Sequence, residues 1–362
     1  MIRGLLKTGI AHGLHLSGAR LGRRGARGAA DGPLVIGYHR VVEDFDRSAG
    51  RAIPAMLVSR AMLARQLDWI ERRYRFVTLD ELTDELRNGR RPGRRAAAIT
   101  FDDGFRDVYE LAFPLLRSKG IPFAVFVITD LISTGRVPPA DHLHLLLSGA
   151  LADGPASARR LVRLVAGLEP GLVPAARLRR LAAAGSVSLL RALLELLPQE
   201  RLLSVIAALE ARVAIERRAL AEHRMMTWEM LRDMRRAGVV VGSHSRTHPL
   251  LSLESRERAE HEITGSRRLL EERLGGPIRH FAYPDGSFDA ATVAAVAAAG
   301  YESAYTTCRH RDPRRPLLTI PRVLLWERSG LDVFGRFSAP VMECTAGGTF
   351  DRVAGCRLAH GT

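Results

Sequence analysis

Seven short apolar segments recur along the chain, and each is followed by Gly, Pro or polar residues. They are four to six residues long and contain β-branched side chains, which is typical of strands buried in a core. The segments are residues 34–38, 96–101, 123–128, 239–242, 280–283, 303–306 and 318–323. The sequence therefore predicts seven buried strands.

Between several of these segments, apolar residues recur at the spacing of a helix. The expected helices cover residues 59–73, 107–118, 227–236, 252–274 and 289–299. Thr227 and Ser252 are suitable N-caps for two of these helices. Alternating strands and helices indicate a parallel sheet with helical crossovers. Because seven strands suit a barrel of β/α units better than a short open sheet, we expect a barrel with its chemistry at the C-terminal strand ends.

Residues 141–225 break this alternation, because they are rich in Leu, Ala and Arg and contain no strand pattern. Stretches such as 175–185 and 199–217 have the pattern of amphipathic helices, so we predict an all-helical insertion. It either covers the active site, binds a partner or forms a packing layer. The full division is an extension at 1–32, barrel segments at 33–140 and 226–325 flanking the insertion, and a C-terminal extension at 326–362 that is poorly structured by composition.

The composition of the 362 residues, 46% hydrophobic and 26% charged, is ordinary for a globular protein. The formal net charge of +15 is carried almost wholly by Arg, with Lys only at positions 7 and 119. The arginines are scattered rather than gathered with aromatic residues, so we do not expect nucleic-acid binding. Attraction to anionic lipid or to an acidic glycan is a milder consequence of the charge. The three cysteines argue against a disulfide framework and are compatible with a reducing compartment.

The N-terminal segment begins with cationic residues, and Lys7, His12 and His15 interrupt its apolar positions. It therefore lacks the apolar core of a signal peptide, and no stretch reaches the roughly 20 apolar residues that span a bilayer. Its leucines could form one face of a short basic amphipathic helix, which either contacts a membrane surface or packs on the domain. We expect a cytoplasmic location, or a peripheral one at the cytoplasmic membrane face.

Two adjacent carboxylates, Asp102 and Asp103, follow the predicted strand 96–101. Carboxylates at the end of an apolar strand are costly to bury unless something stabilises them. Neighbouring strand residues point to opposite faces, so both reach one site only if the backbone leaves strand geometry there, and Gly104 makes such a turn easy. Asp-Asp-Gly is also good turn chemistry, so a simple turn or helix cap is the alternative.

His244 and His248 follow the predicted strand 239–242 at positions i and i+4. This spacing places two imidazoles on one face of a helical turn and is used to bind zinc, although such pairs also occur by chance. Two imidazoles and the carboxylate of Asp103, all from strand ends, make an open three-ligand site with a position for water. That pattern indicates a catalytic metal rather than a structural one, and it leaves Asp102 as a base.

The Thr-Phe-Asp-Asp-Gly segment at 100–104 and the His-Ser-x-x-His segment at 244–248 resemble the paired motifs of the NodB-type polysaccharide deacetylases, or carbohydrate esterase family 4. The resemblance covers roughly residues 33–140 and 226–325. It implies a distorted (β/α)7 TIM-like barrel that removes acetyl groups from N-acetylated sugars, or sometimes O-acetyl groups from xylan. It also implies that Asp102 is the general base, and that Zn²⁺, or another divalent ion such as Co²⁺ or Ni²⁺, binds the set Asp103, His244 and His248.

The segment Phe281–Gly286 resembles the third motif of that family and implies substrate binding by Tyr283, Pro284, Asp285 and Gly286. Backbone N–H groups at Asp285 or Gly286 could bind an oxyanion, and Tyr283 either packs on a sugar ring or belongs to the core. Many members have an Arg at the position of Ala282. Arg279 and Arg322 are the alternatives for that charge, and we favour Arg322 because it lies at a strand end.

The late Leu-x-x-x-His motif that supplies the general acid is not recognisable after position 286, where His310 is only a weak alternative. Instead, Tyr38-His39 at the end of the first strand resembles the N-terminal signature of deacetylases similar to those that act on biofilm poly-N-acetylglucosamine. The resemblance implies that His39 is the acid, whereas a structural histidine is the alternative.

The sequence therefore predicts a metal-dependent hydrolase that removes N-acetyl groups from a GlcNAc-type polysaccharide, oligosaccharide or glycan precursor. An O-acetyl esterase and a non-catalytic glycan-binding protein on the same fold are alternatives, which an assay of acetate release tests. A glycosidase would need two acids placed across a glycosidic bond, and it would leave His244 and His248 without a purpose.

Overall fold

The computed structural model describes residues 33–89, 96–171, 173–307 and 310–349. The amphipathic helix that we predict within residues 1–32 lies outside these ranges and stays a prediction. No helix in the described ranges is both long and apolar enough to cross a bilayer.

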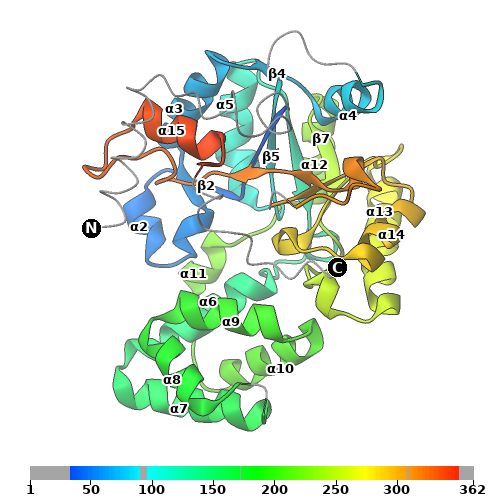
Figure 1. Ribbon diagram of the computed structural model, residues 1–362. Helices are drawn as coiled ribbons and strands as arrows, with labels where there is room; N and C mark the ends of the chain where they lie inside the picture. Colours follow the sequence, from blue (N-terminus) through cyan, green and yellow to red (C-terminus); the bar gives the residue numbers. More distant parts are fainter. Residues whose placement is uncertain (1–32, 90–95, 172, 308–309, 350–362) are drawn as a thin grey trace.

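A ring of parallel strands forms the centre of the molecule (Figure 1). Each of the seven predicted segments contains one strand: β1 (Leu34–Tyr38), β5 (Ala96–Phe101), β6 (Phe123–Val127), β7 (Val240–Ser243), β8 (His280–Ala282), β9 (Ser303–Thr306) and β10 (Ile320–Pro321). The order in the sheet is β10-β9-β8-β7-β6-β5-β1-β11, with β11 at Val323–Leu324 and with β4 (Arg75–Phe76) beside the start of β5. Because only Arg322 separates β10 from β11, the chain itself joins the two edges and nearly closes a distorted barrel.

Helices cover the outside of this barrel. They are α3 (Arg60–Glu71), α4 (Leu79–Arg87), α5 (Phe113–Ser118), α12 (Trp228–Arg236), α13 (Arg256–Leu274) and α14 (Ala290–Ala298). The helix at Leu79–Arg87 was not predicted, and the others lie within the predicted helical segments. Thr227 caps α12 through a hydrogen bond that its side chain accepts from the Met230 N–H. Our prediction of Ser252 as the cap of α13 is wrong, because Ser255 caps that helix and the Ser252 hydroxyl bonds the Ser287 hydroxyl instead.

The minor elements lie mainly in the connections. They are β2 (Arg40–Val42), α2 (Phe45–Ala49), η1 (Pro54–Met56), β3 (Leu57–Ser59), the π-helical η2 (Val108–Ala112), η3 (Thr129–Leu131), η4 (Leu251–Leu253), η5 (Pro284–Gly286) and η6 (Pro316–Leu318). The composition of the C-terminal extension suggested little structure, but within its described part, residues 326–349, Ala339–Ala346 form α15. Met342 of α15 is fully buried against the barrel core, and the resulting apolar contact stabilises the helix.

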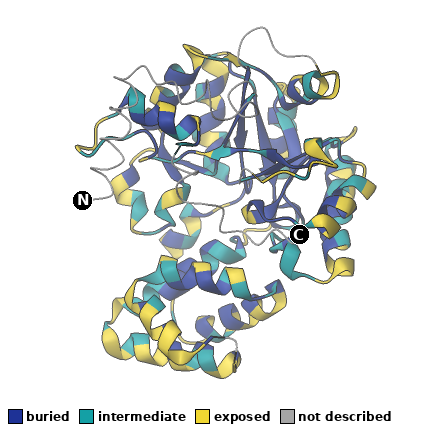
Figure 2. Cartoon of the chain, viewed as in Figure 1, coloured by how far each residue is buried: buried dark blue, intermediate teal, exposed yellow. Residues whose placement is uncertain are grey.

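Between β6 and β7 the chain forms a separate group of helices (Figure 1). These helices are α6 (Pro139–Ala152), α7 (Pro155–Leu168), α8 (Ala175–Ala183), α9 (Ser186–Leu196), α10 (Gln199–Glu210) and α11 (Arg217–Glu222). Their leucines and valines form a core of their own, distinct from that of the barrel. Figure 2 shows this division, with buried residues along the strands and exposed ones on the outer sides of α7 and α8.

Candidate active site

The chain leaves strand geometry at Asp103, as the adjacent carboxylates require. The Asp102 N–H still donates to the Tyr38 carbonyl at 2.8 Å, but Asp103 and Gly104 have φ values of 70° and 85°. A left-handed backbone at a residue other than Gly costs about 1–3 kcal/mol, and such strain gathers at functional sites. A Cβ at Gly104 would lie 2.9 Å from the Val127 side chain, so Gly meets both the conformational and the steric requirement.

The His-Ser-Arg-Thr-His segment is a loop, so our prediction of a helical turn there is wrong. Ser245 and His248 have φ values of 64° and 65°, which no right-handed helix contains. Bonds to groups outside the loop replace the helical ones. The Glu262 carboxylate of α13 accepts from the N–H of Arg246 at 2.9 Å and of Thr247 at 2.8 Å. The Ser245 hydroxyl accepts from the His248 N–H at 3.0 Å.

The two histidines nevertheless converge on Asp103. Its Oδ1 lies 3.5 Å from His244 Nε2 and 3.6 Å from His248 Nε2, and the three potential ligand atoms lie within 4.8 Å of one another. Two ligands about 2.0–2.1 Å from a tetrahedral zinc ion stand roughly 3.3 Å apart, which is close to the two distances from Asp103 Oδ1. His244 Nδ1 lies 2.8 Å from the Ala282 carbonyl, which orients the ring with Nε2 toward the site.

The electrostatics of the three residues also favour a cation. Burial, reinforced by the charge of Asp102, raises the pKa of Asp103 well above its usual value. Burial lowers the pKa of His244 to about 3, so its imidazole is neutral, as a metal ligand must be. A divalent ion would offset the repulsion between the two carboxylates, and the residues present fit such an ion.

Arg322 contacts Asp102 from the junction between β10 and β11. Its guanidinium donates to both carboxylate oxygens, at 2.6 and 2.7 Å, and to the Thr100 hydroxyl at 3.1 Å. Burial alone would raise the pKa of Asp102, but the Arg322 charge and hydrogen bonds outweigh it and contribute to a pKa of about 2. Arg279, the alternative, instead bonds Glu302 and acidic residues of α4.

His39 lies directly after β1, with Nε2 4.0 Å from Asp102 Oδ2 and 17% of its side chain exposed. The pKa of His39 is lowered, because the effect of burial outweighs the opposing effect of the Asp102 carboxylate. His39 therefore stands beside the base and keeps access to solvent. His310, the weak alternative, is exposed and packs against the Phe288 ring.

The segment Phe281–Gly286, the third motif, exposes fewer residues to a substrate than we expected. Tyr283 does not face a sugar site, because it is fully buried in the core and its hydroxyl donates to the Leu318 carbonyl at 3.0 Å. Pro284 and Gly286 are also buried, and the Gly286 N–H already donates to the Tyr283 carbonyl at 2.8 Å. Asp285, with φ 52°, is the one exposed residue of these four.

Two residues that no sequence motif marks position the histidine loop. Glu262 is 1% exposed, and besides the two N–H groups it accepts from the Thr247 hydroxyl at 2.7 Å. Gln199, the first residue of α10, is 4% exposed and donates to the Thr247 carbonyl at 2.6 Å. The helical insertion therefore touches the loop that carries His248. A sequence reading misses both because each is one polar residue among many on an amphipathic helix.

A second buried polar pair joins the two ends of the insertion. Asp141 of α6 and His223, which follows α11, are 2% and 1% exposed, and His223 Nε2 lies 3.7 Å from Asp141 Oδ1. Burial raises the pKa of Asp141 to about 6 and lowers that of His223 to about 4. Both groups therefore titrate in mildly acidic solution.

Comparison with known proteins adds a family and a set of relatives. The family model described as polysaccharide deacetylase matches residues 89–172 and 174–304, which is more than half of the chain. The poly-beta-1,6-N-acetyl-D-glucosamine N-deacetylase of Staphylococcus aureus (strain MSSA476) is 31% identical over 104 residues, or 26% of this chain and 36% of the relative. The Staphylococcus epidermidis protein of the same name is 31% identical over 109 residues, or 28% and 37%. The matches thus span little more than a third of these curated relatives.

Solved structures show the same fold over most of the chain. The Streptococcus pyogenes deacetylase PplD aligns with a TM-score of 0.53 at 17% identity, covering 87% of this chain and 97% of its own. IcaB from Ammonifex degensii aligns with a TM-score of 0.52 at 22% identity, covering 88% and 97%. At these identities the likeness is one of fold.

Proposed function

The chain belongs to the polysaccharide deacetylase family, and from this premise we propose that it is a metal-dependent hydrolase of N-acetylated glycans. It removes N-acetyl groups from a GlcNAc-type polysaccharide, oligosaccharide or glycan precursor. The observation that carries the proposal is the convergence of Asp103, His244 and His248 within 4.8 Å, with the carboxylate of Asp102 beside them. The names of the staphylococcal relatives support a GlcNAc polymer as substrate, and Tyr38-His39 supports a place among members with an N-terminal Tyr-His motif.

In this proposal Asp103, His244 and His248 hold Zn²⁺, or alternatively Co²⁺ or Ni²⁺. A bound divalent ion supplies Lewis acidity, which polarises the acetyl carbonyl and lowers the pKa of a water molecule. Asp102 accepts the proton from the attacking water, and Arg322 keeps its carboxylate ionised and oriented.

His39, whose Nε2 lies 4.0 Å from Asp102 Oδ2 and whose side chain keeps access to solvent, donates a proton to the leaving amine. In the proposal the exposed turn at Asp285 binds the substrate, and its backbone N–H donates to the developing oxyanion. The products are acetate and a sugar amine.

The substitution Asp102→Asn tests the proposal, because it removes the base and keeps the shape of the side chain. Acetate release from poly-β-1,6-GlcNAc and chitooligosaccharides should fall by about 10²–10⁴-fold in this variant. Acetate release from acetylated xylan by the unsubstituted protein tests for O-deacetylation. Metal content, measured by elemental analysis, should remain that of the unsubstituted protein. The exposed substitution Asp153→Asn is the charge-matched control. Activity of the Asp102→Asn variant within threefold of the control would refute the role of Asp102.

A further inference from the structure

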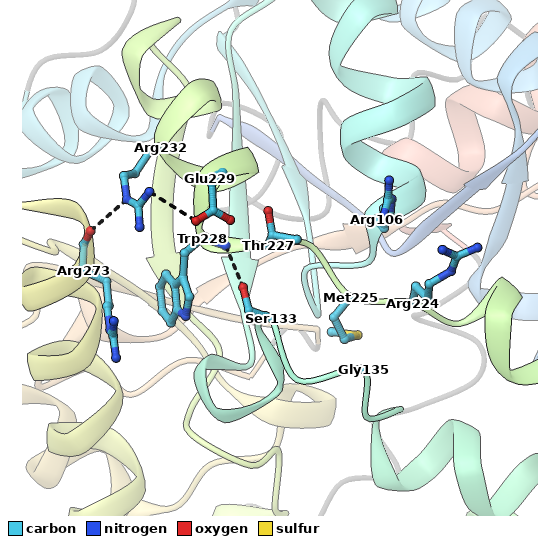
Figure 3. A pocket seen from close by; sticks show the side chains of 10 residues that line it. All are labelled: Arg106, Ser133, Gly135, Arg224, Met225, Thr227, Trp228, Glu229, Arg232 and Arg273. Atoms are coloured by element: carbon cyan, nitrogen blue, oxygen red, sulfur yellow. Dashed lines mark hydrogen bonds and ion pairs between the residues drawn. The ribbon is translucent and has the colours of Figure 1, made fainter.

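An open pocket of about 500 Å³ lies between the start of α12, the loop after η3 and the segment that follows Asp103. Figure 3 shows four arginines on its wall, Arg106, Arg224, Arg232 and Arg273, together with Trp228 and a single acidic residue, Glu229. We call it the arginine pocket. Its volume is in the range of small-ligand sites, and no step of the proposed reaction uses its side chains.

The backbone ties the arginine pocket to the catalytic segment. The Arg106 N–H donates to the Arg224 carbonyl at 2.8 Å, and the Met226 N–H donates to the Gly104 carbonyl at 2.9 Å. Arg106 is three residues beyond Asp103, and because consecutive Cα atoms are about 3.8 Å apart, their Cα atoms lie within roughly 11 Å. The pocket is therefore built in part on the same backbone segment that carries Asp103.

The pocket has an excess of positive charge. Glu229 lies 3.6 Å from Arg232, and Arg106 pairs with Glu110 at 2.7 Å. In the described part of the chain, neither Arg224 nor Arg273 forms an ion pair with a carboxylate. These two guanidinium groups are therefore available to an anionic ligand.

Trp228 adds an aromatic surface beside Arg273, at the end of the pocket opposite Arg224 in Figure 3. The Arg273 guanidinium lies over the indole at 5.9 Å from its centroid, and the Trp228 N–H of the backbone already donates to the Ser133 hydroxyl at 3.0 Å (Figure 3). Recognition would therefore come from side chains. An indole edge or face packs on a pyranose ring, and a guanidinium forms two parallel hydrogen bonds with a carboxylate or phosphate.

We propose that the arginine pocket binds an anionic substituent, a carboxylate or a phosphate, on a sugar unit near the one that is deacetylated. The inference rests on the proposed function, and it narrows the substrate class to acidic N-acetylated glycans. The net charge of +15 would also attract an acidic glycan toward the protein.

The test compares two tetrasaccharides, one alternating N-acetylglucosamine with glucuronic acid and one of N-acetylglucosamine alone. The double variant Arg224→Ala/Arg273→Ala is set against Arg160→Ala/Arg268→Ala, which removes the same charge from exposed positions outside the pocket. We expect KM for the acidic substrate to rise about tenfold in the pocket variant only, because two exposed charge-assisted contacts are lost. KM for the neutral substrate should stay the same in all proteins.

A calorimetric titration of metal-free protein separates this inference from the proposed function, because it needs no turnover. The acidic tetrasaccharide and N-acetylglucosamine 6-phosphate serve as the carboxylate and phosphate probes. Binding of either probe that the pocket variant loses, and the control keeps, supports the inference even if neither glycan is deacetylated. Equal binding by the pocket variant and the control, or no binding by any protein, would overturn it. Deacetylation with no preference for the acidic glycan would overturn it and leave the proposed function intact.

Discussion

Glu262 offers a direct test of how the fold positions His248. Its carboxylate is buried and accepts three hydrogen bonds from the loop that ends at His248. The donors are the N–H groups of Arg246 and Thr247 and the Thr247 hydroxyl. Glu262→Ala removes the acceptor of both N–H groups and leaves a cavity. Glu262→Gln keeps one oxygen acceptor and nearly the same volume.

The magnitude follows from the count of unsatisfied groups. Each of the two N–H groups that lose their acceptor costs about 1–3 kcal/mol, so Glu262→Ala should lower the free energy of unfolding by roughly 2–6 kcal/mol. The left-handed backbone of Ser245 and His248 is maintained by such bonds, so the loop should relax and His248 should move from Asp103. Loss of a residue that orients a metal ligand costs about 10–100-fold in metal affinity.

Titration calorimetry of metal-free protein with Co²⁺ or Zn²⁺ measures that affinity, and urea unfolding measures the stability. Glu260→Ala is the matched control, because Glu260 lies on the same helix and 45% of its side chain is exposed. We expect weaker metal binding by Glu262→Ala, a smaller effect of Glu262→Gln, and none of Glu260→Ala. A metal Kd unchanged in Glu262→Ala, in protein that remains folded, would refute the positioning role.

Two further predictions concern buried charges. Arg322→Met should destabilise the protein by about 3–5 kcal/mol, because it leaves the Asp102 charge buried and unpaired. Adding Asp102→Asn should restore part of that loss. Strictly additive effects of the two substitutions on the free energy of urea unfolding would contradict the pairing. The second prediction concerns His223, whose pKa falls from 6.5 to about 4 on folding, so the unfolded chain binds more protons and this group makes stability fall as pH drops from 6.5 to 4. Asp141, with a raised pKa of about 6, acts in the opposite direction. His223→Gln should therefore lose less stability over this range, by up to roughly 3 kcal/mol, and an unchanged pH dependence of urea unfolding would exclude the assignment.

The strands and the carboxylate pair could be predicted because their signals are local. The apolar run of six residues at 96–101 is short and is followed at once by polar residues and Gly104, which favours a buried strand, and the adjacent carboxylates Asp102 and Asp103 already require an unusual backbone. Because these signals are local, the predicted fold class, a distorted barrel of β/α units, was confirmed. Arg322 also follows from a local signal, its place at a strand end, although only the structure shows that this strand end closes the barrel.

Two of the wrong predictions, at the histidine loop and at Tyr283, share a physical origin, namely contacts between residues distant in sequence. The spacing of His244 and His248 is compatible with a helical turn, but a carboxylate 14 residues beyond His248 provides acceptors that a helix would have supplied internally. Tyr283 has a hydroxyl that a sugar site could use, but the Leu318 carbonyl is buried within its reach. Periodicity predicts which face of an element is buried, but it does not predict which polar groups of other elements that face will contact.

This distinction explains why the insertion should influence the metal centre although it contributes no predicted ligand. Gln199 begins α10 and contacts both the carbonyl and the hydroxyl of Thr247, the residue before His248. The same amide accepts from Arg258 of α13, so the insertion and the barrel meet on one buried side chain. A shift of α10 would therefore change the acceptors available to Thr247 and, through it, the position of His248. The insertion is thus mechanically connected to the proposed metal site, and a packing layer without such a contact would not be.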